Sequence, residues 1–306
     1  MTLLYNRLTY FVAMIYSGNL LRKPEWIRPK IPSGPSYTNV KKTIRTLELH
    51  TVCEEARCPN ISECWGMGTA TIMIMGGICS RRCRFCSVNS GKPELLDPRE
   101  PDNVATAINK LGLRYVVITS VCRDDLPDGG ADHFVETIKT IRTDCPNTVL
   151  EVLIPDFQGY KDLLYKIVKA RPRVISHNIE TVERLSPRVR DFRASYKQSL
   201  MVLQAIYEFD PEIYTKSSLM LGLGETEEEI TDTMKDLRLR KVSILTIGQY
   251  LQPSMKHIPV AEYITPARFD WFAESARQLG FSFVASGSMV RSSYKVGEFL
   301  LKQPRL

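Results

Sequence analysis

Short apolar runs alternate with amphipathic stretches from about residue 69 to residue 287. The apolar runs have the length of buried strands, and the amphipathic stretches repeat with the period of a helix. We expect strands over 69–77, 115–121, 148–156, 173–180, 215–225, 242–250 and 281–287. We expect helices over 101–113, 131–145, 160–170, 196–209, 226–240 and 266–280. The first of these helices should end at Gly112, and Thr226 with Glu229 has the spacing of a capping box.

Repeated strand–helix units predict parallel strands joined by right-handed crossovers. The sequence carries no Rossmann glycine fingerprint, which favours a barrel. The predicted fold is therefore α/β, a partial (β/α)6 TIM-like barrel with N-terminal and C-terminal extensions. We expect the first extension over residues 1–65, the barrel over 66–285 and the second extension over 286–306. Functional side chains should lie at the carboxyl ends of the strands.

The N-terminal extension has two segments with patterns of their own. Residues 24–38 are rich in Pro and Gly and predict an extended arm. Residues 39–50 predict a short helix with Val40, Ile44 and Leu47 on one face.

Residues 1–21 are apolar but are interrupted by Asn6 and Arg7. They contain no run of about 18 apolar residues, so a transmembrane helix is not expected. They also lack the ordered parts of a secretory signal peptide. The presence of arginine without acidic residues leaves an organellar leader within residues 1–20 open, and the expected location is the cytoplasm.

The chain has 306 residues, a net charge of +7 and eight cysteines, six of them between positions 53 and 86. A chain of this length does not need disulfides, so clustered cysteines indicate metal ligands and a reducing compartment. The positive charge favours an acidic partner. Cys145, before a proline at a predicted helix end, is interpreted as an ordinary thiol.

Two cysteine triads stand out within this cluster. Cys79, Cys83 and Cys86 have C-x3-C-x2-C spacing and directly follow a predicted strand. Structural zinc and ferredoxin-type clusters both use four ligands, so three thiolates would leave one iron of a cubane cluster open. The second triad has C-x4-C-x5-C spacing and needs a fourth ligand from elsewhere; its members are Cys53, Cys58 and Cys64. A zinc site is the alternative for either triad.

The first triad resembles the signature of the radical S-adenosylmethionine superfamily, in which an aromatic residue such as Phe85 commonly lies near the adenine. The two triads together resemble those of lipoyl synthases. So do CPNISECWG, TSVCRDDLPDGGA, EVLIPDFQG, SHNIETV, MLGLGETEEE, TIGQYLQPS and GSMVRSSY. The resemblance covers about residues 24–297.

The resemblance implies the final step of lipoate biosynthesis, a sulfurtransferase reaction. Two sulfur atoms are inserted at C6 and C8 of an octanoyl chain on a lysine of a lipoyl carrier protein. It implies two [4Fe-4S] clusters and two S-adenosylmethionine molecules per lipoyl group. The second triad would hold an auxiliary cluster that donates sulfur, and Ser292 of the RSSY motif would be its fourth ligand. Ser293 is the alternative ligand, and Arg291 is assigned to the same catalytic motif.

Further polar positions are candidates for binding S-adenosylmethionine. Asn178 and Glu180 follow a predicted strand, and the carboxylate could accept hydrogen bonds from the ribose; a strand-end salt bridge is the alternative. Arg193 is a candidate contact for the methionine carboxylate. Other positions near predicted strand ends are Gly76, Gly77, Cys122, Gln249 and Tyr250, of which Cys122 stands where an acid is usual in the family. We do not expect His133, His177 or His257 to bind metal.

The partners follow from the same resemblance. They are an octanoylated lipoyl carrier domain, either an E2 subunit or the H protein of glycine cleavage, and a ferredoxin or flavodoxin as electron donor. We expect no nucleic acid, no membrane and a monomer. A radical enzyme that modifies tRNA and a non-catalytic iron–sulfur or zinc module are the alternatives. The last of these predicts no cleavage of S-adenosylmethionine by the reduced protein.

Overall fold

The computed structural model describes residues 21–29, 31, 33–66, 70–293 and 296–302, and the remaining positions lie outside the described residues. The candidate organellar leader within residues 1–20 falls outside them. No helix in the described part of the chain has the length and hydrophobicity needed to cross a bilayer.

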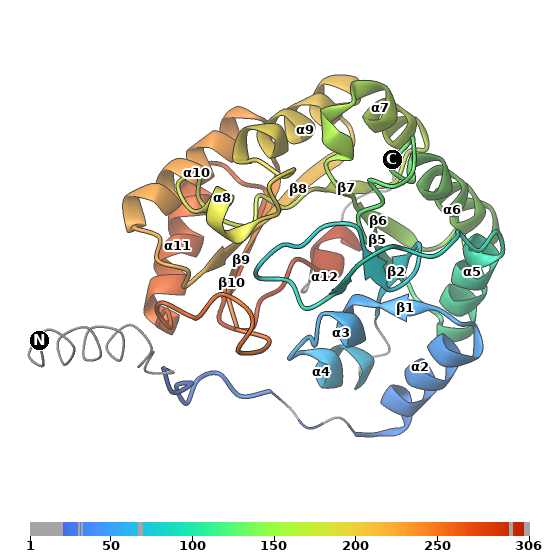
Figure 1. The fold of residues 1–306 in the computed structure, drawn as a ribbon, viewed down its shortest axis with the longest axis horizontal. Helices are drawn as coiled ribbons and strands as arrows, with labels where there is room; N and C mark the ends of the chain where they lie inside the picture. The colour runs from blue at the N-terminus through green and yellow to red at the C-terminus, as the bar shows by residue number, and fades with distance from the viewer. Residues whose placement is uncertain (1–20, 30, 32, 67–69, 294–295, 303–306) are drawn as a thin grey trace, which may run out of the picture.

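Seven parallel strands form a curved sheet that follows the order of the sequence, β2-β5-β6-β7-β8-β9-β10 (Figure 1). Their bounds are Thr71–Ile74, Tyr115–Ser120, Val149–Leu153, Val174–Ser176, Tyr214–Leu221, Ile244–Gln249 and Phe283–Gly287. β1 (His50–Thr51) adds an antiparallel edge strand beside β2. The predicted partial α/β barrel is confirmed.

Helices cover the outer face of this sheet (Figure 1). They are α5 (Glu100–Leu111), α6 (Ala131–Asp144), α7 (Lys161–Lys169), α9 (Tyr196–Phe209), α10 (Glu227–Leu239) and α11 (Pro266–Gln278). Gly112 ends α5 with φ +62°, a left-handed conformation that suits glycine, and the predicted capping box of Thr226 and Glu229 begins α10. A short helix, α8 (Ser186–Val189), and a 3-10 turn, η1 (Phe157–Gly159), lie in the loops.

The N-terminal extension differs from the sequence prediction in where its first helix begins. α2 spans Pro35–Thr46, so the predicted extended arm ends at Gly34 and not at residue 38. Proline in the first turn fixes a helical φ and lacks only an N–H that has no partner there, which explains the earlier start. Val40 and Ile44 are buried as predicted, and Leu47, just past the helix end, is partly buried against the same core. The helix ends at Thr46, earlier than the predicted residue 50. The extension continues with α3 (Val52–Glu55) and α4 (Ile61–Gly66).

The C-terminal segment returns into the barrel. After β10 the chain reaches α12 (Val296–Leu300), which Figure 1 shows at the centre of the ring. Val296 and Leu300 are buried against the first residues of six strands, which are Tyr115, Val149, Val174, Tyr214, Ile244 and Phe283. The helix therefore closes the end of the barrel at which the strands begin.

Two glycines allow this segment to approach the strands closely. A Cβ on Gly297 of α12 would lie 2.7 Å from the Tyr115 ring, and a Cβ on Gly248 of β9 would overlap the Val290 carbonyl. Any other residue at these two positions would force the C-terminal segment away from the sheet.

One layer above α12, a charged group is buried inside the barrel. The Lys216 ammonium on β8 lies 2.5 Å from the Glu151 carboxylate on β6, and both side chains are at most 1% exposed. Ser176 donates to the same carboxylate at 2.6 Å, and the Tyr115 hydroxyl donates to its second oxygen. Burial lowers the pKa of Lys216, and the adjacent carboxylate opposes that shift. Each charge thus depends on its partner for compensation.

We predict that Glu151→Leu lowers the free energy of unfolding by about 3–5 kcal/mol, because it leaves a buried ammonium without a counter-charge. Adding Lys216→Met to this variant should restore part of the loss. Anaerobic denaturant titration followed by circular dichroism measures both. The matched control is Asp232→Leu, which breaks the exposed Lys235–Asp232 pair, and we expect a change below about 1 kcal/mol. A Glu151→Leu effect no larger than that of the control contradicts this account.

Candidate functional site

A cavity of about 560 Å³ opens at the carboxyl ends of the strands. Its volume is in the range typical of small-molecule sites. Segments far apart in the sequence line it, namely the N-terminal extension, the loop after β2, the strand ends and the C-terminal segment. All six cysteines of the predicted triads, Cys53, Cys58, Cys64, Cys79, Cys83 and Cys86, belong to its wall.

The first triad lies on a loop that neighbouring backbone holds in place. The amides of Arg81 and Cys122 donate to the Cys79 sulfur at 3.4 and 3.3 Å, and the amide of Asp191 donates to the Cys83 sulfur at 3.3 Å. Hydrogen bonds of this kind stabilise a thiolate and tune an iron–sulfur site. His257 contacts the Cys86 carbonyl at 3.0 Å, so this histidine supports the loop through its backbone.

Cys122 lies directly beside the first triad. A hydrogen bond from Cys122 lowers the pKa of Cys79 to about 6, while the same contact and burial raise the pKa of Cys122. The structure thus brings Cys122 to the site, while Cys145 is buried elsewhere, with its thiol 3.4 Å from the Ala105 carbonyl.

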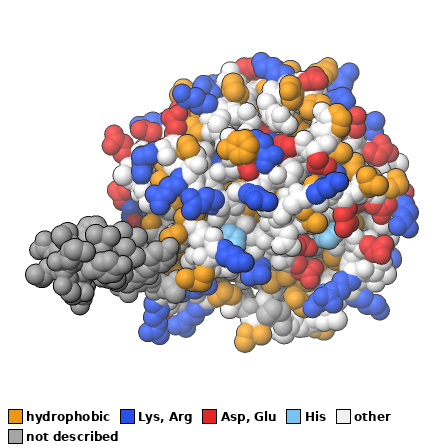
Figure 2. Space-filling view, in the orientation of Figure 1, with side chains coloured by type: hydrophobic (Ala, Val, Ile, Leu, Met, Phe, Trp, Pro, Cys, Tyr) orange, Lys and Arg blue, Asp and Glu red, His pale blue; other side chains and the backbone are white. Residues whose placement is uncertain are grey.

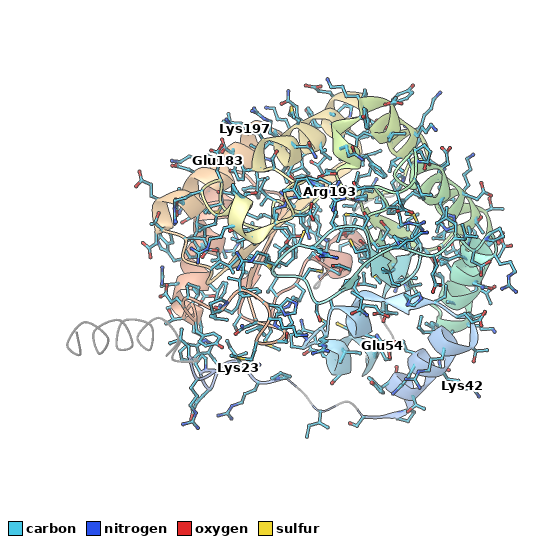
Figure 3. All side chains as sticks on the ribbon, viewed as in Figure 1. Lys23, Lys42, Glu54, Glu183, Arg193 and Lys197 are labelled. Atoms are coloured by element: carbon cyan, nitrogen blue, oxygen red, sulfur yellow. The ribbon has the colours of Figure 1, made fainter. Side chains whose placement is uncertain are left out.

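The second triad comes from α3, α4 and the turn between them, beside Glu54 of α3 in Figure 3. The Asn60 amide in this turn donates to the Met289 carbonyl at 2.6 Å, which joins positions 229 residues apart. Ser292 and Ser293 line the same cavity as the triad. Arg291 lies close enough to Cys58 for its charge to lower the thiol pKa, although burial raises that pKa overall. The structure therefore brings the RSSY segment and the second triad together, and both serines are within the shared cavity.

The cysteines fit iron–sulfur clusters in their chemistry. All eight cysteines of the chain are described, and each is a free thiol. Burial raises the pKa of Cys53 and Cys86 to about 12, so bound iron would be needed to hold these sulfurs as thiolates. In the described residues no three His, Cys, Asp or Glu side chains surround a single metal position.

A polar wall faces the first triad across the cavity. The Asn178 side-chain amide donates to Glu180 at 3.0 Å, and its oxygen is buried without a hydrogen-bond partner among the described residues. Glu180 has a φ of +68°, and burial raises its pKa while the nearby Arg190 opposes that shift. Strained backbone and an unpartnered polar atom are common at ligand sites. Their predicted contact with S-adenosylmethionine stays a prediction, as does that of Phe85, which also lines the cavity.

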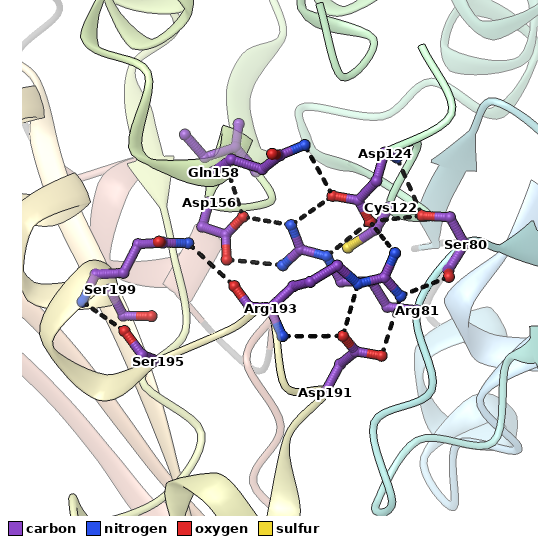
Figure 4. Close-up of polar contacts among 12 residues, drawn as sticks. Ser80, Arg81, Cys122, Asp124, Asp156, Gln158, Asp191, Arg193, Ser195 and Ser199 are labelled. Carbon is purple, nitrogen blue, oxygen red and sulfur yellow. Dashed lines mark hydrogen bonds and ion pairs between the residues drawn. The ribbon is translucent and has the colours of Figure 1, made fainter. Parts of the chain in front are cut away.

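The structure does not bring Arg193 into this cavity. Its guanidinium binds Asp191 at 2.8 Å and the Ser80 carbonyl at 2.8 Å, on the face seen in Figures 3 and 4. Arg190, three residues earlier, lines the cavity and is 7% exposed. Sequence reasoning missed Arg190, because two arginines in one short loop give no signal as to which points inward.

The remaining candidates have defined positions. Gly76 turns the chain after β2 with φ +85°, and Gly77 packs on His50. Gln249 and Tyr250 line the cavity. The side-chain amide of Gln249 also donates to three backbone carbonyls. His133 pairs with Glu100 at 2.7 Å, away from both triads. His177 lines the cavity, and its ring nitrogens contact the Ile154 carbonyl and the Ser199 hydroxyl.

Comparisons with known proteins agree with this arrangement. The sequence profile of the Radical SAM superfamily matches residues 73–237, and the profile of the N-terminal domain of lipoyl synthase matches residues 13–58. Lipoyl synthase from Myxococcus xanthus is 53% identical over 281 residues, 92% of this chain and 94% of its own. The mitochondrial lipoyl synthase of Drosophila melanogaster is 53% identical over 287 residues, 92% of this chain and 76% of its own.

Solved structures share the fold at low sequence identity. Streptococcus suis SuiB bound to S-adenosylmethionine superposes with a TM-score of 0.54 at 9% identity, covering 74% of this chain and 54% of SuiB. HydG, a maturase of the [FeFe]-hydrogenase, superposes with a TM-score of 0.52 at 16% identity, covering 76% of this chain and 58% of HydG. The barrel, the two triads and the sequence relatives lead to one conclusion: the chain belongs to the lipoyl synthase family of the radical S-adenosylmethionine superfamily and is an enzyme of lipoate biosynthesis.

Proposed function

We propose that the chain inserts sulfur at C6 and C8 of an octanoyl chain carried on a lysine of a lipoyl carrier domain. The observation that carries the proposal is that two cysteine triads and the RSSY serines line one cavity. A site for a radical reaction and a site for a sulfur source must face the same substrate carbon atoms. The alternative of a tRNA-modifying enzyme receives no support from relatives that match 92% of the chain as lipoyl synthases.

The residues that would hold the two clusters are the two triads, with Ser292 as the fourth ligand of the second. Bound there, such clusters supply the electron for reductive cleavage of S-adenosylmethionine and the sulfur for transfer to carbon. A serine oxygen is a hard ligand for a site otherwise built from soft sulfur, so it should be released more readily than a thiolate. We therefore assign Ser292 the role of an exchangeable ligand, with Arg291 beside it.

The cavity wall suits an aliphatic substrate. Val117, Leu153 and Met220 face the interior, and Met73 and Val52 add apolar surface. Unactivated C–H bonds offer no acidic proton, so the protein's task is to hold the chain near the reacting groups and exclude water. A different part of the cavity wall offers polar and aromatic surface for S-adenosylmethionine, provided by Asn178, Glu180 and Phe85.

Arg81 fixes the loop of the first triad to the barrel (Figure 4). Its guanidinium donates to Asp124 from Nη2 and Nε at 2.7 and 2.8 Å, and to Asp156 from Nη1 and Nη2 at 2.7 Å. The Arg81 side chain is only 4% exposed. The guanidinium holds the pKa of Asp156 at about 2 despite burial, and it also lowers the pKa of Asp124. Such forked pairs set direction as well as distance. We infer that Arg81 is a positioning residue for the cysteine loop.

The proposal extends to partners and compartment. A lipoyl carrier domain provides the substrate, as either an E2 subunit or a glycine cleavage H protein, and a ferredoxin or flavodoxin provides electrons to a monomer. Free cysteines favour a reducing compartment, and we propose the cytoplasm. Relatives named as mitochondrial in Drosophila and apicoplast in Plasmodium knowlesi support the interior of an organelle as the other choice.

Anaerobically reconstituted protein should contain about eight irons per chain, as two four-iron clusters require. Cys83→Ala should reduce this to about four and abolish S-adenosylmethionine cleavage, because it removes a ligand of the first site. Cys58→Ala should also reduce iron to about four but retain cleavage while losing lipoyl product. Iron analysis and mass spectrometry of an octanoyl-lysine peptide measure these outcomes. About four irons in the parent protein would contradict the proposed sulfur source, because only one four-iron cluster would then be bound.

Ser292→Ala should lower lipoyl formation at least about tenfold, a change of about 1.4 kcal/mol in transition-state stabilisation. Cleavage of S-adenosylmethionine should persist, since the first triad is unchanged. Ser293→Ala is the matched control and should retain product formation. Ser292→Cys should retain iron but form less product, because a thiolate is harder to displace. If Ser293→Ala loses product formation and Ser292→Ala retains it, the fourth ligand is Ser293 and not Ser292.

Arg81→Met should lower the free energy of unfolding by about 3–5 kcal/mol, because the buried Asp156 carboxylate loses its cation and Asp124 keeps only its longer contact with Arg193. It should also lower the iron bound at the first triad. Arg81→Lys keeps the charge but not the forked geometry, so we expect an intermediate loss. Denaturant titration and iron analysis provide the readouts. Full iron content together with unchanged stability in Arg81→Met would show that the loop does not depend on this residue.

A further inference from the structure

The loop of the first triad is one layer thick between the cavity and solvent. Cys83 and Phe85 line the cavity, while Arg82 and Arg84, the alternating residues, are exposed. A group bound to the first triad is therefore separated from the surface by the width of a single backbone. Along this direction the first triad comes close to the outside of the molecule.

Two other segments pack against the outer edge of this loop. The Arg84 amide donates to the Val189 carbonyl at 2.9 Å, and the Ile258 amide donates to the Arg84 carbonyl at 3.2 Å. These contacts bring further exposed side chains beside the loop. We call the resulting surface the loop patch; it consists of Arg82, Arg84, Arg188, Phe192, Met255 and Lys256.

The loop patch combines unpaired positive charge with exposed apolar surface. Among the described residues, no carboxylate forms an ion pair with its four cations. The neighbouring Asp191 is 6% exposed and already paired with Arg193 at 2.8 Å. Phe192 is 89% exposed and Met255 72% exposed. Lys and Arg side chains extend over much of the face in Figure 2.

We propose that the loop patch docks an acidic electron-transfer protein that reduces the group bound at the first triad. This inference rests on the proposed function, which needs one electron for each S-adenosylmethionine cleaved. The donor protein loses that electron, and breaking the sulfonium carbon–sulfur bond consumes it. Electron transfer slows steeply with distance, so a donor gains most by docking where the wall is thinnest. Unpaired arginines steer an acidic partner, and an exposed aromatic gives it an apolar contact.

The same surface does not suit entry of the substrate chain. The Arg84 amide and carbonyl are both hydrogen-bonded to neighbouring segments, which closes the wall at this place. An octanoyl chain needs an opening into the cavity, whereas an electron needs only proximity. This difference favours a redox protein over the lipoyl carrier domain as the occupant of the loop patch.

The test compares Arg82→Glu/Arg84→Glu with Lys42→Glu/Lys139→Glu, a control with the same change in net charge at exposed positions on α2 and α6. Binding of an oxidised, acidic flavodoxin to the cluster-loaded protein is measured by calorimetry at two salt concentrations. The loop-patch variant should bind at least about tenfold more weakly, with a smaller salt dependence, and the control should match the parent. Iron content is measured for every protein.

Activity with two reductants completes the test. With reduced flavodoxin, cleavage of S-adenosylmethionine by the loop-patch variant should fall at least about tenfold, whereas with dithionite it should stay within about twofold of the parent. Equal losses with both reductants, or unchanged flavodoxin binding, overturn the proposal. Weaker binding of an octanoylated carrier domain with unchanged flavodoxin binding would assign the surface to the substrate and overturn it as well. Failure of the parent to convert an octanoyl-lysine peptide with dithionite would count against the proposed function and not against docking.

Discussion

The packing of α12 against the first residues of six strands is the constraint on which the rest of the site depends. A parallel barrel of seven strands leaves its narrow end open unless something fills it, and here the chain fills that end with its own C-terminal segment. Residues 288–293 follow β10, and the last three of them, Arg291, Ser292 and Ser293, line the cavity. The bond between Asn60 and Met289 then fixes the N-terminal triad to the same segment.

The buried Lys216 and Arg81 side chains, inside the barrel and around its opening, are paired with opposite charges beside them. At the narrow end the layer around α12 is mainly apolar, and the next layer holds Lys216 against Glu151. Above them the cavity wall carries thiols that burial keeps protonated, with Cys79 as the exception. Arg81 is neutralised by two carboxylates in the loops around the same opening. The cavity thiols are the groups of this wall that could bind a metal group.

The parts of the fold that sequence patterns predicted are those with local causes. Strand and helix positions followed from apolar periodicity, and the start of α10 followed from Thr226 and Glu229. The triads followed from cysteine spacing, because ligands close in sequence are close in space whatever the fold. The helix start at Pro35 was missed because the Pro and Gly content of the arm outweighed the preference of proline for a first turn.

The parts that could not be predicted depend on distant contacts. Nothing local shows that Arg190 and not Arg193 faces the cavity, because that choice depends on Ser199 binding one and Asp191 binding the other. The short apolar stretch at 296–300 also gives no local indication that it packs against the first residues of the strands. Lys216 within a predicted barrel strand was a usable signal, since a lysine buried there must find an acid inside.

The position of the C-terminal segment also sets an order for biogenesis. A ribosome makes Cys53, Cys58 and Cys64 early and Ser292 only after the strands of the barrel have been made. The first triad can be surrounded by its strands and loops while synthesis continues, but Ser292, the proposed fourth ligand of the second triad, becomes available only after residue 292 has emerged. The nascent chain can therefore complete one cysteine site before the other, and the serine side of the second site forms last.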